Sequence, residues 1–233
     1  MSIKQRQSNI ELLRIVCMIL IVAGHANNLV YGIPMKTEMM AAPAIMSFRI
    51  IAYQLCVVAV NCFVFISGWF AIKTKFKRGT RLIIQTLEYG LGLSLLFLLL
   101  GFSVPKMQFI RIFFIGENYW FIIAYLQLFI LAPALNFFAE KASQNMFKTV
   151  VVSCFVFEFI YGWIGGVGNY ADGYSGIHFV GLYLLAQYIR NYVKFEKITH
   201  SRAWMLYLTP AAVSVALIGA GGGVLVKNGN TQC

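Results

Sequence analysis

Apolar residues along the chain are gathered into seven runs, separated by short polar or basic segments. The runs cover residues 9–28, 50–72, 82–104, 119–138, 149–166, 177–192 and 203–226. A helix needs about 20 predominantly apolar residues to cross a bilayer. Most of the runs meet this length, and the short sixth run is expected to use Lys194 and its neighbours as snorkelling anchors. The pattern predicts an all-α fold, a polytopic membrane bundle of about seven helices forming one domain over residues 1–233.

Two local features refine this bundle. Residues 104–118 mix apolar side chains with Lys106 and Arg111, which is typical of a helix lying in the membrane interface. Pro133 lies inside the fourth run, and we expect it to kink or terminate that helix.

Lys and Arg residues are distributed unevenly between the connections. An inside N-terminus places 13 of them in cytoplasmic segments and five in outer segments, with Arg14 in the membrane. Cytoplasmic loops carry the excess of positive charge, so we predict an N-in, C-out topology. The segment 73–81 is then inside and the segment 165–176 outside. Receptors of the G-protein-coupled type have the opposite orientation.

Composition narrows the class of protein further. The chain has 60% hydrophobic and 12% charged residues, which excludes an ordinary soluble domain. The net charge of +11 lies in short loops, so it argues for topology and against nucleic-acid binding. The cysteines form no CxxC pair and indicate neither a disulfide framework nor a metal site; they are Cys17, Cys56, Cys62, Cys154 and Cys233. The first run contains an arginine and lacks a small-residue cleavage site, so we interpret it as a retained helix.

Ionisable residues in the first run carry the candidate chemistry. Glu11 and Arg14 are three residues apart, close enough to pair on a helix surface. Eleven residues of helix turn about 1100° and rise about 16 Å, so Arg14 and His25 share one face at opposite ends of the run. The alternative is that Glu11 and Arg14 snorkel to the headgroups while His25 caps the other interface.

Two motifs connect these residues to a known family. The opening NIELLR-x10-H resembles the first membrane helix of the acyltransferase-3 family, bacterial O-acyltransferases that modify envelope polysaccharides. The stretch NCFVFISGWFAIKTKFKRGTRLI resembles the family's SGF helix end followed by a basic RxxR segment. Here Arg78 and Arg81 match the arginine pair, Ser67 and Gly68 match the SG, and Trp69 replaces the usual Phe.

The resemblance implies a chemistry. The chain is expected to be a multi-pass protein of the bacterial cell membrane that moves an acyl group, most simply acetyl, from cytoplasmic acyl-CoA to a hydroxyl of an envelope polysaccharide or exopolysaccharide. His25 would be the general base, because imidazole titrates near neutral pH. Arg14, supported by Glu11, would shape the inner entrance, and Arg78 and Arg81 would grip the phosphates of CoA.

Other interpretations remain open. Family members have about ten membrane helices, so we expect this chain to be incomplete at its C-terminus. A transporter or flippase-like protein for a lipid-linked sugar or small solute, or a non-catalytic subunit, also fits intramembrane charges.

Glu88 and Glu158 lie in apolar runs and would either orient His25, line an acceptor channel or pair with an arginine. We interpret His178 as an interfacial residue, and His200 lies in a basic cytoplasmic segment.

Overall fold

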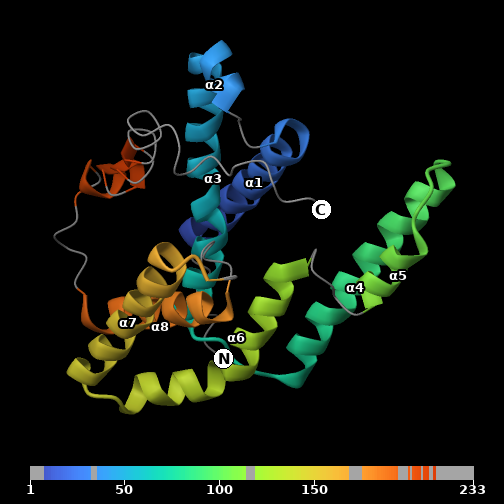
Figure 1. Cartoon of the computed structure of the whole chain (residues 1–233). Coiled ribbons are helices and arrows are strands. Elements are labelled where there is room, and N and C mark those ends of the chain that lie inside the picture. The colour runs from blue at the N-terminus through green and yellow to red at the C-terminus, as the bar shows by residue number, and fades with distance from the viewer. Residues whose placement is uncertain are drawn as a thin grey trace. The chain divides into compact units, whose positions relative to one another are not determined.

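The computed structural model describes residues 8–32, 36–113, 119–167, 175–193, 199, 201–205, 207–209 and 212–213. These residues form helices joined by short connections, and no strand occurs among them (Figure 1). In chain order the helices are α1 Ser8–Tyr31, α2 Lys36–Ala41, α3 Pro43–Phe70, α4 Phe76–Leu99, α5 Lys106–Phe113, α6 Trp120–Lys141, α7 Gln144–Glu158, the π-helix η2 Phe159–Ile164, and α8 Gly176–Tyr192. The prediction of an all-α fold is confirmed.

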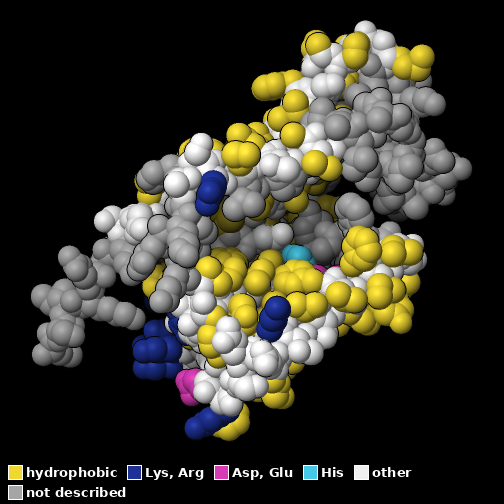
Figure 2. All heavy atoms as spheres, turned by 90° about the vertical axis from the view of Figure 1, so that its left-hand side faces the viewer, with side chains coloured by type: hydrophobic (Ala, Val, Ile, Leu, Met, Phe, Trp, Pro, Cys, Tyr) yellow, Lys and Arg dark blue, Asp and Glu magenta, His cyan; other side chains and the backbone are white. Residues whose placement is uncertain are grey.

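Five helical stretches are long and apolar enough to cross a membrane: Ser8–Asn28, Pro43–Phe70, Phe76–Leu99, Trp120–Lys141 and Gln144–Gly162. They correspond to the first five predicted runs. The sixth run is α8, which has 17 residues, and most of the seventh lies outside the described residues. Apolar side chains cover much of the face in Figure 2, as expected of helices that contact lipid. The chain is a polytopic membrane protein, while its seven-span count and its orientation stay predictions.

Packing divides the chain into two compact units. Unit 1 comprises Met1–Phe63 and Lys194–Cys233, and unit 2 comprises Val64–Val193. Helices α1 and α2 and most of α3 belong to unit 1, and the helices from α4 to α8 belong to unit 2. The expectation of one domain stays a prediction, and the two units are described separately.

In unit 1, α1 lies against the first part of α3. A Cβ added at Gly24 would lie 3.0 Å from Cβ of Cys56, so the helices approach closely there. Arg49, on α3, donates to the carbonyl oxygen of Gly32 just after the end of α1, at 2.8 Å. Its guanidinium also lies 5.1 Å from the ring centroid of Tyr31. These contacts fix the end of α1 that follows His25.

In unit 2, α8 is the central helix and packs against α6 and α7. Its fully buried side chains include Phe179, Tyr183 and Leu184. The end of α3 also approaches α8 closely, because a Cβ at Gly68 would lie 2.5 Å from the carbonyl oxygen of Tyr183. Only glycine allows this approach, which accounts for the SG motif.

A polar network holds the turn between α3 and α4. The Tyr183 hydroxyl donates to Oδ1 of Asn136 at 2.7 Å and accepts from the backbone N–H of Ile72 at 2.8 Å. The Asn136 amide donates to the carbonyl oxygen of Ile72 at 3.0 Å, and Gln187 donates to Oδ1 of Asn136 at 3.0 Å. Ala71, the residue before Ile72, has a φ of 55°, a left-handed conformation that a non-glycine residue rarely adopts. The network therefore holds a strained turn in place.

Two boundaries differ from the sequence-based expectation. Helix α6 continues past Pro133 to Lys141, so the proline does not terminate it; membrane helices tolerate proline where neighbouring groups satisfy the freed carbonyl. Helix α4 begins at Phe76, so Arg78 and Arg81 lie on a helix and not in a loop. The helix predicted after the third run is confirmed as α5, and its place in the membrane interface stays a prediction.

Candidate functional site

His25 lies on the last two turns of α1, and a backbone contact fixes its ring. Its Nδ1 is 2.8 Å from the carbonyl oxygen of Ile21, one turn earlier. A carbonyl oxygen only accepts, so Nδ1 carries the hydrogen in this contact. In the neutral ring Nε2 then holds the lone pair. The side chain is exposed on the helix surface.

Arg14 and Glu11 pair near the start of the same helix. The distance from Arg14 Nη1 to Glu11 Oε1 is 3.0 Å, as their spacing predicts, and the two side chains are 41% and 39% exposed. Because α1 is continuous from Ser8 to Tyr31, the predicted shared face and the rise of about 16 Å between Arg14 and His25 follow from helix geometry. The catalytic roles of Glu11, Arg14 and His25 stay predictions.

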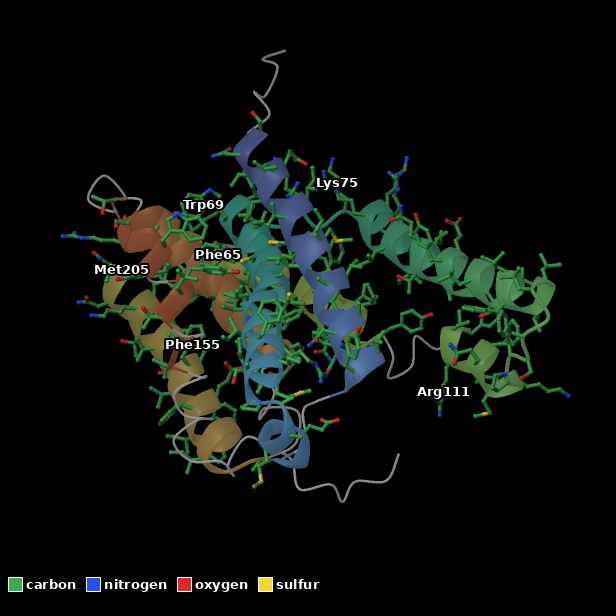
Figure 3. The ribbon with its side chains drawn as sticks, turned by 90° about the horizontal axis from the view of Figure 1, so that it is seen from above. Phe65, Trp69, Lys75, Arg111, Phe155 and Met205 are labelled. Carbon is green, nitrogen blue, oxygen red and sulfur yellow. The ribbon has the colours of Figure 1, made fainter. Side chains whose placement is uncertain are left out.

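Arg78 and Arg81 lie in the first two turns of α4 and are exposed. A spacing of three residues places them on one side of the helix. Lys75 is the residue before α4 and makes no side-chain cap to the helix start. Figure 3 labels Lys75 together with Trp69 of α3, the residues on either side of the turn held by the polar network. A helix N-terminus attracts anions, and basic side chains beside it strengthen that field.

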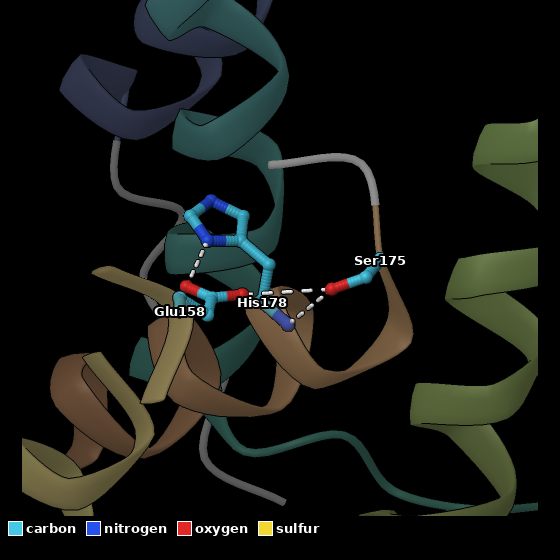
Figure 4. Close-up of polar contacts among 3 residues, drawn as sticks. All are labelled: Glu158, Ser175 and His178. Carbon is cyan, nitrogen blue, oxygen red and sulfur yellow. Dashed lines mark hydrogen bonds and ion pairs between the residues drawn. The ribbon is translucent and has the colours of Figure 1, made fainter. Parts of the chain in front are cut away.

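A second candidate histidine, His178 of unit 2, pairs with Glu158, which the sequence did not predict. Nδ1 of His178, on α8, lies 2.8 Å from Oε2 of Glu158, the last residue of α7 (Figure 4). The side chains are only 14% and 12% exposed. Among the described residues, Glu158 thus pairs with a histidine and not with the arginine considered above. The side chain of His178 is largely buried, and its place at the membrane interface stays a prediction.

Ser175 completes the arrangement from the N-cap of α8. Its hydroxyl accepts from the backbone N–H of His178 at 3.1 Å and donates to Oε1 of Glu158 at 3.5 Å. The hydroxyl therefore contacts the carboxylate and the backbone, not the imidazole, so this is not a serine nucleophile with its base. Nε2 of His178 is buried and has no hydrogen-bond partner among the residues that the structure describes.

The other acidic candidate is placed differently. Glu88 is exposed on α4.

The signal for the Glu158 pair was present in the sequence: an acid near the end of one apolar run and a histidine at the start of the next. Read separately, neither residue indicated the other. His200 lies outside the described residues.

No group of three or more His, Cys, Asp or Glu side chains arranged to hold a metal ion occurs within the described part of the chain. The chemistry available from these residues is acid–base catalysis, hydrogen bonding and anion binding.

Comparison with known proteins agrees with the motifs. A family model described as an acyltransferase domain, that of acyltransferase-3, matches residues 7–231 and so covers both units. No curated protein and no solved structure matched the chain.

Proposed function

The chain belongs to the acyltransferase-3 family, and from this premise we propose that it transfers an acyl group, most simply acetyl, from cytoplasmic acyl-CoA to a hydroxyl of an envelope polysaccharide or exopolysaccharide. The family establishes a membrane acyltransferase in general terms. The donor, the acceptor and a location in the bacterial cell membrane are our proposal.

The geometry of His25 carries the proposal. Its Nδ1–H is held by the carbonyl oxygen of Ile21 at 2.8 Å, which leaves Nε2 as the nitrogen able to take a proton. The contact comes from the helix that carries the residue, so it orients the ring before any substrate arrives. A base oriented in this way needs little rearrangement during the reaction.

The reaction would transfer the acyl group directly from the thioester to the acceptor hydroxyl. Nε2 of His25 removes the proton of the acceptor hydroxyl, and the oxygen forms a bond to the thioester carbonyl carbon. The carbon–sulfur bond breaks, and the CoA thiolate leaves and takes up the proton held by His25, which restores the base. Arg78 and Arg81 would hold the phosphates of the donor, and Arg14, paired with Glu11, would shape the inner entrance.

Transfer from radiolabelled acetyl-CoA to de-O-acetylated polysaccharide tests this function. Membranes containing the chain should label the polysaccharide, and His25→Ala membranes with equal protein by immunoblot should not. Equal labelling by the His25→Ala variant would remove the catalytic role of His25. Absence of transfer by the unmodified chain would contradict the proposal and bring forward the transporter interpretation.

A further inference from the structure

The Glu158–His178 pair has no task in the reaction described above. We propose that Nε2 of His178 binds a hydroxyl of the sugar acceptor, which makes His178 a positioning residue for that substrate. The inference rests on the proposed function, because it takes the acceptor to be a glycan. Three observations in unit 2 support it.

The unpartnered nitrogen is the first observation. A buried polar atom without a hydrogen-bond partner costs free energy, and folded proteins leave few of them. Within the described part of the chain, Nε2 of His178 is such an atom, whereas Nδ1 of the same ring is bound at 2.8 Å. A purely structural contact between α7 and α8 would require only Nδ1. The open Nε2 therefore points to a ligand.

The orientation of the ring specifies the chemistry of that ligand. The carboxylate of Glu158 accepts the Nδ1–H, so Nε2 points away from it (Figure 4). Nε2 bears a lone pair if the ring is neutral and an N–H if the ring is protonated. A hydroxyl both donates and accepts, so it pairs with Nε2 in either state. A carboxylate or an ammonium group would suit only one.

The surroundings are the second observation. The ring of Phe155 lies edge-on to His178 with centroids 6.5 Å apart. An aromatic side chain beside an oriented polar group is a common feature of small-molecule sites. The side chains of the pair are 14% and 12% exposed, so the pair lies at the edge of the packed interior.

The backbone conformation of the residues after Glu158 is the third observation. Glu158 ends α7, and the next six residues, Phe159–Ile164, form the π-helix η2. Short π-helical segments are rare and occur frequently at functional sites. Ser175 fixes the carboxylate from the other side while capping α8. Both the acid and the histidine are thus held at the ends of their helices.

Steady-state kinetics with acetyl-CoA and de-O-acetylated polysaccharide oligosaccharides distinguishes positioning from catalysis. His178→Ala should raise the KM for the oligosaccharide about tenfold, the effect of one lost hydrogen bond in a buried site, and leave kcat within about threefold. A fall in kcat with unchanged KM would overturn the positioning role. Unchanged kcat and KM would also overturn it, because a water molecule would then be the partner of Nε2.

Glu158 provides matched variants. Glu158→Ala frees the ring and should raise the KM as His178→Ala does. Glu158→Gln keeps an oxygen that accepts the Nδ1–H, so it should recover most of the lost affinity. Equal losses in the Ala and Gln variants would contradict orientation by this contact. Protein amounts are matched by immunoblot of the membrane fraction.

A chemical protection assay separates this inference from the proposed function. Diethyl pyrocarbonate modifies imidazole nitrogens, and mass spectrometry of the peptide containing His178 measures the rate. The oligosaccharides should slow modification of His178 at least threefold, and acetyl-CoA alone should not. This result would support the site even if no acyl transfer were detected or the His178→Ala variant failed to fold. An unchanged rate would refute it.

Discussion

Nδ1 of His25 lies 2.8 Å from the carbonyl oxygen of Ile21, so one helix both carries the proposed base and fixes which ring nitrogen bears its hydrogen. The contact depends only on the backbone of α1 and not on a neighbouring carboxylate. His178 gains the same orientation from Glu158, a side chain of another helix. The two histidines therefore respond to different substitutions.

His25→Asn tests the base without removing the orienting contact. The asparagine amide can still donate toward the carbonyl oxygen of Ile21, but it offers no nitrogen that takes a proton. Acyl transfer should fall about 10²- to 10⁴-fold, as for His25→Ala. Transfer from acetyl-CoA is measured in membranes with matched protein amounts. His200→Ala is the control and should keep wild-type transfer. Substantial activity in His25→Asn would show that this imidazole is not the base.

Gly68→Ala should destabilise the protein. The added Cβ would meet the carbonyl oxygen of Tyr183 at 2.5 Å and Cβ of Ala186 at 2.9 Å, and neither backbone nor Cβ can move without shifting a helix. We expect a loss of about 1–3 kcal/mol, the usual cost of overpacking. Thermal unfolding of the detergent-solubilised protein, followed by size-exclusion chromatography, measures the change.

Gly92→Ala is the matched control on α4. A Cβ there meets nothing within 4 Å, and alanine favours a helix over glycine by about 0.5–1 kcal/mol. This variant should unfold at the wild-type temperature or above. Equal melting temperatures for the two variants would mean that α3 does not approach α8 as closely as the structure shows.

Asn136→Ala should weaken both the fold and donor binding. It leaves the Tyr183 hydroxyl, the Gln187 amide and the carbonyl oxygen of Ile72 without their partner, and each unpaired buried group costs about 1–3 kcal/mol. Since this network holds the turn before Arg78, the KM for acetyl-CoA should rise as well. Thermal unfolding and donor kinetics measure the two effects. Asn136→Asp keeps the oxygen that accepts from Tyr183 and Gln187 but loses the donor to Ile72, so it should also lose stability. Unchanged stability in both variants would contradict the network.

Much of the architecture was predictable from periodicity and composition. Runs of apolar residues depend on the local sequence alone, so the first five spans and the short helix α5 were located within several residues. The pairing of Glu11 with Arg14 was also predictable, because both belong to one helix. The sequence left open whether Pro133 kinks or terminates its helix, and termination is excluded, since the fate of a helix past a proline depends on its neighbours.

The contacts that were missed all join distant parts of the chain. Glu158 and His178 are 20 residues apart, and Asn136 is 64 residues from Ile72. No spacing rule links such residues, because their contacts result from the packing of separate helices and turns. The sequence showed Gly68 only as part of a motif. The structure shows why glycine is needed there: the backbone of Tyr183 lies against it.

The predicted orientation can be tested by cysteine labelling. Single cysteines at Lys75 and at Asp172, in a variant that lacks the native cysteines, report on the two segments that differ most in charge. A membrane-impermeant maleimide added to intact cells should label Asp172→Cys only, because positively charged segments stay inside. Labelling of Lys75→Cys alone would reverse the topology and place the donor on the wrong side for Arg78 and Arg81.

Replacement of Arg78 and Arg81 together tests the donor site. Both side chains are exposed near the start of α4, where the helix dipole already favours an anion, and each can form a charge-assisted hydrogen bond to a phosphate. Loss of two such bonds in a solvated site should raise the KM for acetyl-CoA about 10- to 100-fold. Lys replacements keep the charge but lose the bidentate geometry, so they should recover only part.

The control for this pair removes the same charge from the same segment. Lys73→Ala with Lys77→Ala also lowers the net charge by two, but it leaves both arginines in place. If the site recognises phosphates specifically, the lysine variant should change the KM less than about threefold. Salt gives an independent measure, because screening weakens exposed ionic contacts. The KM of the unmodified protein should rise with salt more steeply than that of the Arg78→Ala, Arg81→Ala variant. Equal effects of the lysine and arginine variants would mean that the segment acts only through its total charge, as a determinant of topology.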